Sequence, residues 1–186
     1  MKKICFLSIL ILALLSFANP VLILAQKAPE GIAGLKWGDG TSDYINNLDD
    51  VTPLLLSGDP FGLRIATRWI RRFGDVLVDH ANYCFFEDRF CGCSIPFSEI
   101  DSLTAFREGL LSKYGKPQGK RDLRLMINPI ATIGDELIWS LENKVHIVLQ
   151  WNNLKSKGCL DYLYLPIWNE KLEKDKKSGN KVKDSL

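Results

Sequence analysis

Six short strand-like segments, each bounded by turn residues, constrain the fold of this chain more than any other feature. They form two groups of three, at 64–73, 76–86 and 90–97, then at 136–141, 145–151 and 159–167. Each has the length of a β-strand, and the turns between neighbours are short. Strands connected by such turns pair antiparallel. The sequence therefore predicts an antiparallel sheet of about six strands.

A helix over 98–114 separates the two groups. Ser98 is its predicted cap, and apolar residues then recur at helical spacing up to Tyr114, where Gly115 and Pro117 end the helix. A shorter helix is predicted at 41–48, capped by Thr41 or Ser42, with Trp37 packed back on it. Each half is then one helix followed by three strands. The expected fold class is α+β, with the helices packed on one face of the sheet.

The first 25 residues have the features of a secretory signal. Lys2 and Lys3 precede an apolar run, Pro20 interrupts it, and small residues lead to Ala25. We expect cleavage after Ala25, with cleavage after Ala18 or a retained membrane anchor as alternatives. The protein is then secreted or periplasmic, in a bacterial cell envelope. Residues 26–168 are expected to form a single domain.

Residues 169–186 are rich in lysine and acidic residues and contain few apolar side chains. Such a composition is typical of a disordered, solvated tail, although its lysines could also contact anionic lipid. The formal net charge of the whole chain is +2, and the signal itself contributes Lys2 and Lys3. A mature chain near neutrality argues against a nucleic-acid binder. No segment after the signal is long and apolar enough to span a membrane.

Four cysteines remain after removal of the signal with its Cys5: Cys84, Cys91, Cys93 and Cys159. An even number in an exported chain predicts disulfides. A two-residue turn at Glu87-Asp88 would place Cys84 opposite Cys91, and a turn at Asp88-Arg89 would place it opposite Cys93. The remaining cysteine of the pair could then reach Cys159. A three-residue loop would instead turn Cys84 to the other face of the sheet.

The main alternative is a metal or redox site. A single C-x-C with two isolated cysteines lacks the paired knuckles of zinc sites, and the C-x-x-C redox motif is absent from the sequence. The common hydrolase, metalloprotease and nucleotide-binding motifs are absent as well. His80 and His146 are interpreted as surface or partly packed side chains. We expect no enzymatic activity, no cofactor and no metal.

The densest basic cluster is the candidate binding site. It consists of Arg64, Arg68, Trp69, Arg71 and Arg72. On one strand, Arg64, Arg68 and Arg72 would share a face, and Arg71 would join Trp69 on the other. Arginine and tryptophan are enriched at binding hot spots, which favours a protein or envelope partner. The plainer explanation of these arginines is a solvated or edge strand, protected by its charges, and an anion-binding or partner-binding patch is the other.

Two stretches resemble known families. Gly34-Leu-Lys-Trp-Gly38, followed by a capped helix, resembles the opening of small exported bacterial proteins of unknown function. Lys113-Tyr-Gly-Lys-Pro117 at a helix end, with Trp139 and Tyr162 on later strands, is similar to β-lactamase-inhibitor-like domains, which also occur in outer-membrane assembly lipoproteins. The lipoprotein cysteine is missing from this chain. The resemblance implies an envelope or secreted α+β module that binds other proteins and catalyses nothing.

The leading hypothesis is therefore an exported, non-enzymatic module that binds a protein or envelope component. A carrier of a small apolar or lipid ligand is the first alternative, since five tryptophans and nine phenylalanines could line a cavity. A thiol- or metal-dependent enzyme is the second, and it would require free thiols.

Overall fold

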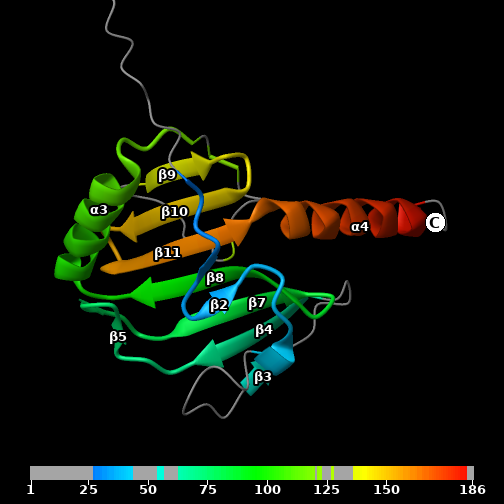
Figure 1. Ribbon diagram of the computed structural model, residues 1–186, viewed down its shortest axis with the longest axis horizontal. Coiled ribbons are helices and arrows are strands. Elements are labelled where there is room, and N and C mark those ends of the chain that lie inside the picture. The colour runs from blue at the N-terminus through cyan, green and yellow to red at the C-terminus, as the bar shows by residue number, and fades with distance from the viewer. Residues whose placement is uncertain are drawn as a thin grey trace, which may run out of the picture.

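The computed structural model describes residues 27–43, 54–56, 63–119, 121–122, 127 and 136–183 (Figure 1). The predicted signal at 1–25 and the greater part of the predicted helix at 41–48 lie outside these residues.

Within the described residues, seven strands form one antiparallel sheet in the order β3–β4–β7–β8–β11–β10–β9 (Figure 1). Their bounds are Leu54–Leu56 (β3), Leu63–Arg68 (β4), Ala81–Phe86 (β7), Arg89–Phe97 (β8), Glu136–Leu141 (β9), Val145–Asn152 (β10) and Lys157–Tyr164 (β11). The six longer strands confirm the predicted α+β class with an antiparallel sheet, and β3 adds a three-residue edge strand. The arrangement as two helix-first halves stays a prediction.

Two of the predicted strands are each broken in two. The segment 64–73 divides into β4 and β5 (Arg72–Phe73), and 76–86 divides into β6 (Val76–Leu77) and β7. Strands β5 and β6 form a separate two-stranded hairpin, which turns at Gly74 with a φ of 61°. The hairpin leaves the sheet because it packs on helix α3 (Ile100–Tyr114): the rings of Phe73 and Phe106 lie 6.3 Å apart, and Ser102 Oγ donates to Leu77 O at 2.7 Å.

Helix α3 covers one face of the sheet, which we call the α3 face. The strand side chains buried there include Tyr83, Phe85, Cys93, Ile95, Phe97, Trp139, Ile147, Leu149, Leu160 and Tyr162. The predicted stop at Gly115 is confirmed, with a φ of 63°. The predicted Ser98 cap is wrong: Glu99 is the N-cap, without a side-chain capping bond, and Ser98 Oγ donates to Asp79 Oδ2 at 2.9 Å instead.

Helix α4 (Leu165–Lys183) begins on the opposite face, which we call the α4 face, and then extends away from the sheet (Figure 1). The predicted strand 159–167 therefore ends at Tyr164, and the tail predicted to be disordered from residue 169 is helical up to Lys183. Ile167 and Trp168 are buried against Cys84, Phe86, Cys91 and Leu163. Ile167 and Trp168 thus give the first turn of α4 a buried apolar contact with the sheet, and this contact stabilises a helix whose remaining residues are mostly charged.

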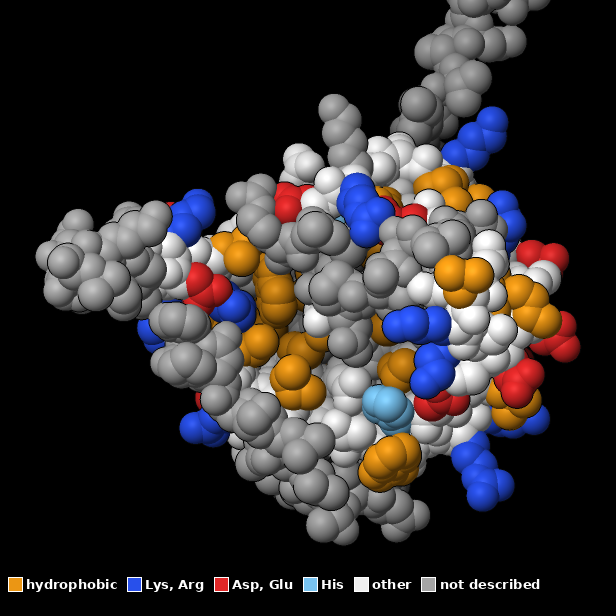
Figure 2. Space-filling view, turned by 180° about the vertical axis from the view of Figure 1, so that it is seen from behind, with side chains coloured by type: hydrophobic (Ala, Val, Ile, Leu, Met, Phe, Trp, Pro, Cys, Tyr) orange, Lys and Arg blue, Asp and Glu red, His pale blue; other side chains and the backbone are white. Residues whose placement is uncertain are grey.

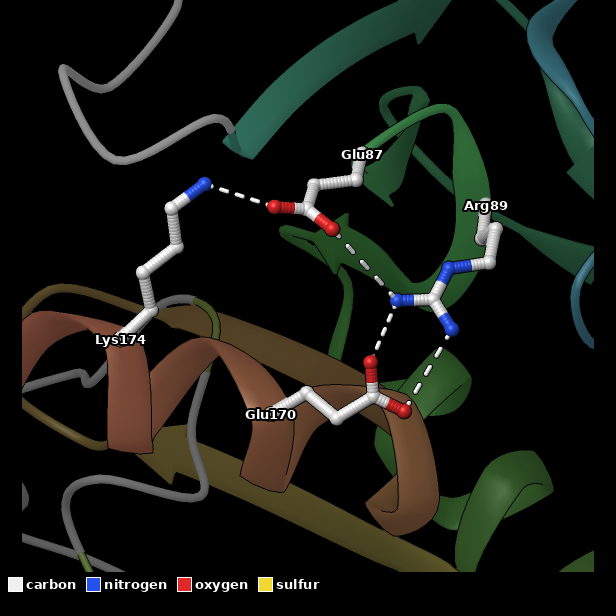
Figure 3. A network of polar contacts seen from close by, with 4 residues as sticks. All are labelled: Glu87, Arg89, Glu170 and Lys174. Carbon is white, nitrogen blue, oxygen red and sulfur yellow. Dashed lines mark hydrogen bonds and ion pairs between the residues drawn. The ribbon is translucent and has the colours of Figure 1, made fainter.

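Ion pairs attach the first turns of α4 to the turn between β7 and β8 (Figure 3). Arg89 Nη2 lies 2.5 Å from Glu170 Oε2 and 3.9 Å from Glu87 Oε2. Lys174 Nζ donates to Glu87 Oε1 at 2.7 Å and lies 5.4 Å from the centre of the Phe86 ring. Hydrogen bonds from Arg89 lower the pKa of the Glu170 carboxyl. Each exposed pair contributes little alone, but together they orient the helix on this turn.

The N-terminal segment crosses the α3 face as a strap that contains β1 (Gly31–Ile32) and β2 (Leu35–Lys36) (Figure 1). Trp37 stacks on Phe90 at 5.1 Å and on Tyr164 at 5.5 Å between ring centroids, and its Nε1 donates to Pro29 O at 2.7 Å. The Trp-Gly motif thus fastens the strap to the sheet. Gly38, with a φ of 91°, turns the chain so that its N–H donates to Phe90 O at 2.9 Å.

We expect Trp37→Ala to lower the free energy of unfolding by about 2 kcal/mol, because it removes two stacked aromatic contacts and a partly buried ring. Trp69→Ala is the matched control, since that ring is 76% exposed, and it should change stability by less than about 0.5 kcal/mol. Urea unfolding followed by circular dichroism measures both. Equal losses in the two variants would contradict the role assigned to Trp37.

Candidate binding surface

The structure brings the predicted site residues together only in part. Arg64 and Arg68 share the α3 face of β4, opposite Phe85 and Ala81, as predicted. Arg72 does not belong to their face, because β4 ends at Arg68 and Arg72 lies in β5. Strand β4 is also an inner strand, with β3 outside it, rather than the edge strand considered from the sequence.

Trp69 is the centre of the surface. It follows β4 directly, is 76% exposed, and its ring lies 5.3 Å from that of His80 at an interplanar angle of 53°. On the side turned away from Figure 1, a surface histidine lies with hydrophobic and basic side chains around it (Figure 2). Because a second ring already restricts the exposed tryptophan, the side chain would lose little conformational entropy on binding a partner. We call Trp69, Arg71, Arg72 and His80 the Trp69 surface.

A chain of hydrogen bonds holds the His80 ring in place. Thr67 Oγ1 donates to Asn82 Oδ1 at 2.7 Å, and Asn82 Nδ2 lies 3.3 Å from His80 Nε2. With the amide oxygen accepting from Thr67, the amide nitrogen is placed to donate to Nε2 of a neutral His80 ring. The sequence reading did not identify these supporting residues, because nothing local indicates that their side chains meet.

The two remaining arginines belong to the β5–β6 hairpin. Arg71 and Arg72 are exposed, and Arg72 Nη1 donates to Asp75 O at 2.9 Å. A cleft between this hairpin and the start of α3 adds acidic groups beside them. It is lined by Arg72, Asp75, Val76, Leu77, Glu99, Asp101, Ser102 and Ala105. The cleft thus has the basic Arg72 and the half-exposed Leu77 on the hairpin side and the acidic Glu99 and Asp101 on the α3 side.

Partial burial lowers the pKa of His80 below its ordinary 6.5, and Asp79 opposes the shift. The neutral ring therefore contributes stability above pH 6.5 that is lost as the pH falls through the lowered pKa. We expect an NMR titration to place the midpoint of His80 below 6.5. Trp69→Ala should raise that midpoint, because it removes the ring that shields His80. A His80 midpoint at or above 6.5, or a midpoint that is the same in Trp69→Ala as in the unmodified protein, would contradict the stacked arrangement.

The four cysteines are buried thiols in the structure, and none is joined in a disulfide. Burial raises the pKa of Cys91 to about 12 and raises the pKa values of Cys84, Cys93 and Cys159 well above the ordinary range. A buried thiol that stays protonated is a poor nucleophile. Among the described residues, no group of three His, Cys, Asp or Glu side chains is arranged to hold a metal ion.

The α4 face carries a buried polar row that the sequence reading missed. Ser94, His146, Gln150 and Asp161 are all buried. Ser94 Oγ lies 3.0 Å from Cys159 Sγ, which donates to Asp161 Oδ1 at 3.2 Å, and the N–H of Ile127 donates to Asp161 Oδ2 at 3.2 Å. His146 was expected to be a surface or partly packed side chain, because polar side chains on one face of a strand predict exposure to solvent, but it is buried with 2% of its surface exposed.

Replacing Asp161 with alanine leaves the N–H of Ile127 and the thiol of Cys159 without their acceptor. Because both donors are part-buried or buried, we expect unfolding free energy to fall by about 1–3 kcal/mol. Glu108→Gln, on the exposed side of α3, is the control and should stay within about 0.5 kcal/mol of the unmodified protein. Urea titration distinguishes them. A loss no larger than that of the control would show that Asp161 does not hold this face together.

Comparisons with protein-family models, with curated proteins and with solved structures found no match to this chain. The resemblances to small exported bacterial proteins and to β-lactamase-inhibitor-like domains therefore stay predictions. Among the described residues, no helix is long and apolar enough to cross a membrane.

Proposed function

We propose that this protein is an exported, non-enzymatic module of a bacterial envelope, and that it binds a protein partner through the Trp69 surface. The single observation that carries this proposal is the tryptophan itself. A large apolar ring stays 76% exposed while it is held against His80, and the exposed Arg71 and Arg72 follow it closely in the sequence. Tryptophan and arginine supply much of the binding energy in protein interfaces.

The contrast with the other aromatic side chains supports this choice. Trp139, Phe85 and Phe97 are fully buried, and Trp37 is fastened by two rings and a hydrogen bond. Among the residues that the structure describes, most of the aromatic side chains that suggested a ligand carrier are packed in the core, as Phe97 is by stacking on Trp151 at 5.8 Å. Trp69 lies outside this core, and its exposed ring, followed in the sequence by two exposed arginines, has the composition that is enriched at binding hot spots.

The charged side chains of this surface indicate which chemical groups a partner should present. Arg71 and Arg72 favour a carboxylate, which an arginine fork can bind with two hydrogen bonds. The acidic side chains at the start of α3 favour a basic or neutral group on the other side of the cleft. We therefore propose a folded protein or a peptide that presents an apolar pocket for Trp69, flanked by an acidic side chain facing Arg71.

The test places a photo-crosslinking phenylalanine analogue at position 69, in cells that export the protein, and identifies the adduct by mass spectrometry. Position 154 is the matched control, because Leu154 is 75% exposed in the turn between β10 and β11. We expect a discrete adduct from position 69 and none from position 154. Equal labelling at both positions, or none at 69, would contradict the proposal.

The crosslinked partner then serves in a binding measurement with purified variants. We expect Trp69→Ala to weaken binding by about 30-fold, which corresponds to about 2 kcal/mol, and Arg71→Glu to weaken it in a salt-dependent manner. Leu154→Ala should bind as the unmodified protein does, and circular dichroism should show the fold intact in all three. Unchanged affinity in both surface variants would rule out this site.

A further inference from the structure

The turn between β7 and β8 has the two residues Glu87 and Asp88, both with positive φ (49° and 63°), and it places Phe86 opposite Arg89. Continued without a break, this register would set Cys84 opposite Cys91. The structure instead pairs Phe85 with Phe90 and Cys84 with Gly92. Cys91 is the extra residue of a β-bulge, so both Cys91 and Gly92 lie opposite Cys84.

The side chain of Cys91 lies on the α4 face together with that of Cys84, and the bulge sets Gly92 on this face as well. Both are buried in the same small cluster, and Cys91 Sγ lies 3.3 Å from the carbonyl oxygen of Cys84. The space beside Gly92 is filled by its neighbours, because a Cβ there would lie 3.0 Å from the Leu163 side chain and 2.9 Å from that of Ile127. Residues directly opposite in an antiparallel pair bring their Cβ atoms close to the range of a disulfide.

The other two cysteines are placed away from this pair. Cys93 lies opposite Tyr83 and Tyr162, and its side chain is buried on the α3 face. Cys159 lies opposite Pro96, four positions along β8 from Gly92, which is about 13 Å along the strand. It is engaged there with Ser94 and Asp161. The two disulfides expected from the sequence are thus reduced to one geometrically accessible pair.

We propose that Cys84 and Cys91 form a disulfide across the bulge, while Cys93 and Cys159 remain thiols. The reaction is thiol–disulfide exchange with a small-molecule or protein disulfide as oxidant. One thiolate attacks the oxidant and releases its first thiol. The second cysteine, as thiolate, then attacks the mixed disulfide and releases the other. The two cysteines lose two protons and two electrons, and the oxidant disulfide is reduced to two thiols.

The bond would form before α4 covers the site. In the folded protein Ile167 and Trp168 pack over both cysteines, and burial keeps them protonated, with the pKa of Cys91 raised to about 12. Exchange requires a thiolate and access, so the folded reduced protein should react slowly. Once formed, the bond fixes the bulge and the register of the hairpin whose turn holds Lys174 of α4 through Glu87.

The test uses the chain from residue 26, unfolded and reduced, then refolded with reduced and oxidised glutathione. Remaining thiols are alkylated, and a non-reducing tryptic digest is analysed by mass spectrometry. Cleavage after Arg89 falls between the two cysteines, so the bond joins peptide 73–89 to peptide 90–107. We expect an intact mass lighter by two hydrogens, this linked pair, and alkylation of Cys93 and Cys159.

Two matched variants distinguish the neighbouring thiols of peptide 90–107. The linked pair should disappear in Cys91→Ala and persist in Cys93→Ala, and fragmentation of the wild-type pair should place the bond on Cys91 even if a variant fails to fold. A bond to Cys93 or Cys159, or four alkylated thiols in the refolded wild-type chain, would overturn the proposal. This outcome does not depend on the Trp69 surface, which lies outside the cysteine cluster.

Discussion

The pairing of β8 with β11 is the interaction on which the rest of this structure depends. The chain leaves β8 through α3, enters the sheet again at its far edge as β9, and returns strand by strand until β11 lies beside β8. Only this pairing makes one sheet of strands that lie on either side of the helix in the sequence. It also fixes both faces, since it sets Tyr162 beside Cys93 and Leu163 beside Gly92. A slip of one residue would exchange the apolar face for the polar one.

The turn between β7 and β8 attaches the rest of the chain to that sheet. The carboxylate of Asp88 accepts from the N–H of Thr41 at 3.2 Å and from its hydroxyl, and these bonds lower the pKa of Asp88. The neighbouring Glu87 holds Lys174 of α4. A two-residue turn thus fastens segments from both ends of the described chain. A β-bulge bends its strand, so the bulge at Cys91 determines the direction in which the two strands carry this turn. It therefore affects the position of every segment that the turn holds.

Local signals were sufficient to predict the six longer strands of the sheet, and helix α3 with its end at Gly115, but they missed β3 and left the turn at Glu87-Asp88 as one of three alternatives. They were insufficient where a contact joins distant residues. Arg89 and Glu170 lie 81 positions apart, so the sequence near residue 170 reads as a charged tail although its first turns are anchored. The bulge at Cys91 was missed for a related reason. An extra residue leaves the composition of a strand unchanged and becomes visible only in the register of the partner.

For the candidate surface too, the sequence identified the residues but not their positions in the fold. The density of arginine and tryptophan identified it, but the end of β4 at Arg68 decides its geometry. That break releases Trp69 from the sheet, so the ring rests on His80, and it moves Arg71 and Arg72 into a hairpin carried by α3. The surface therefore spans two bodies of the fold, the sheet and the helix with its hairpin. A partner that contacts the sheet and the hairpin at once must fit the relative position of the two. This requirement adds to the specificity that the charges of the surface provide.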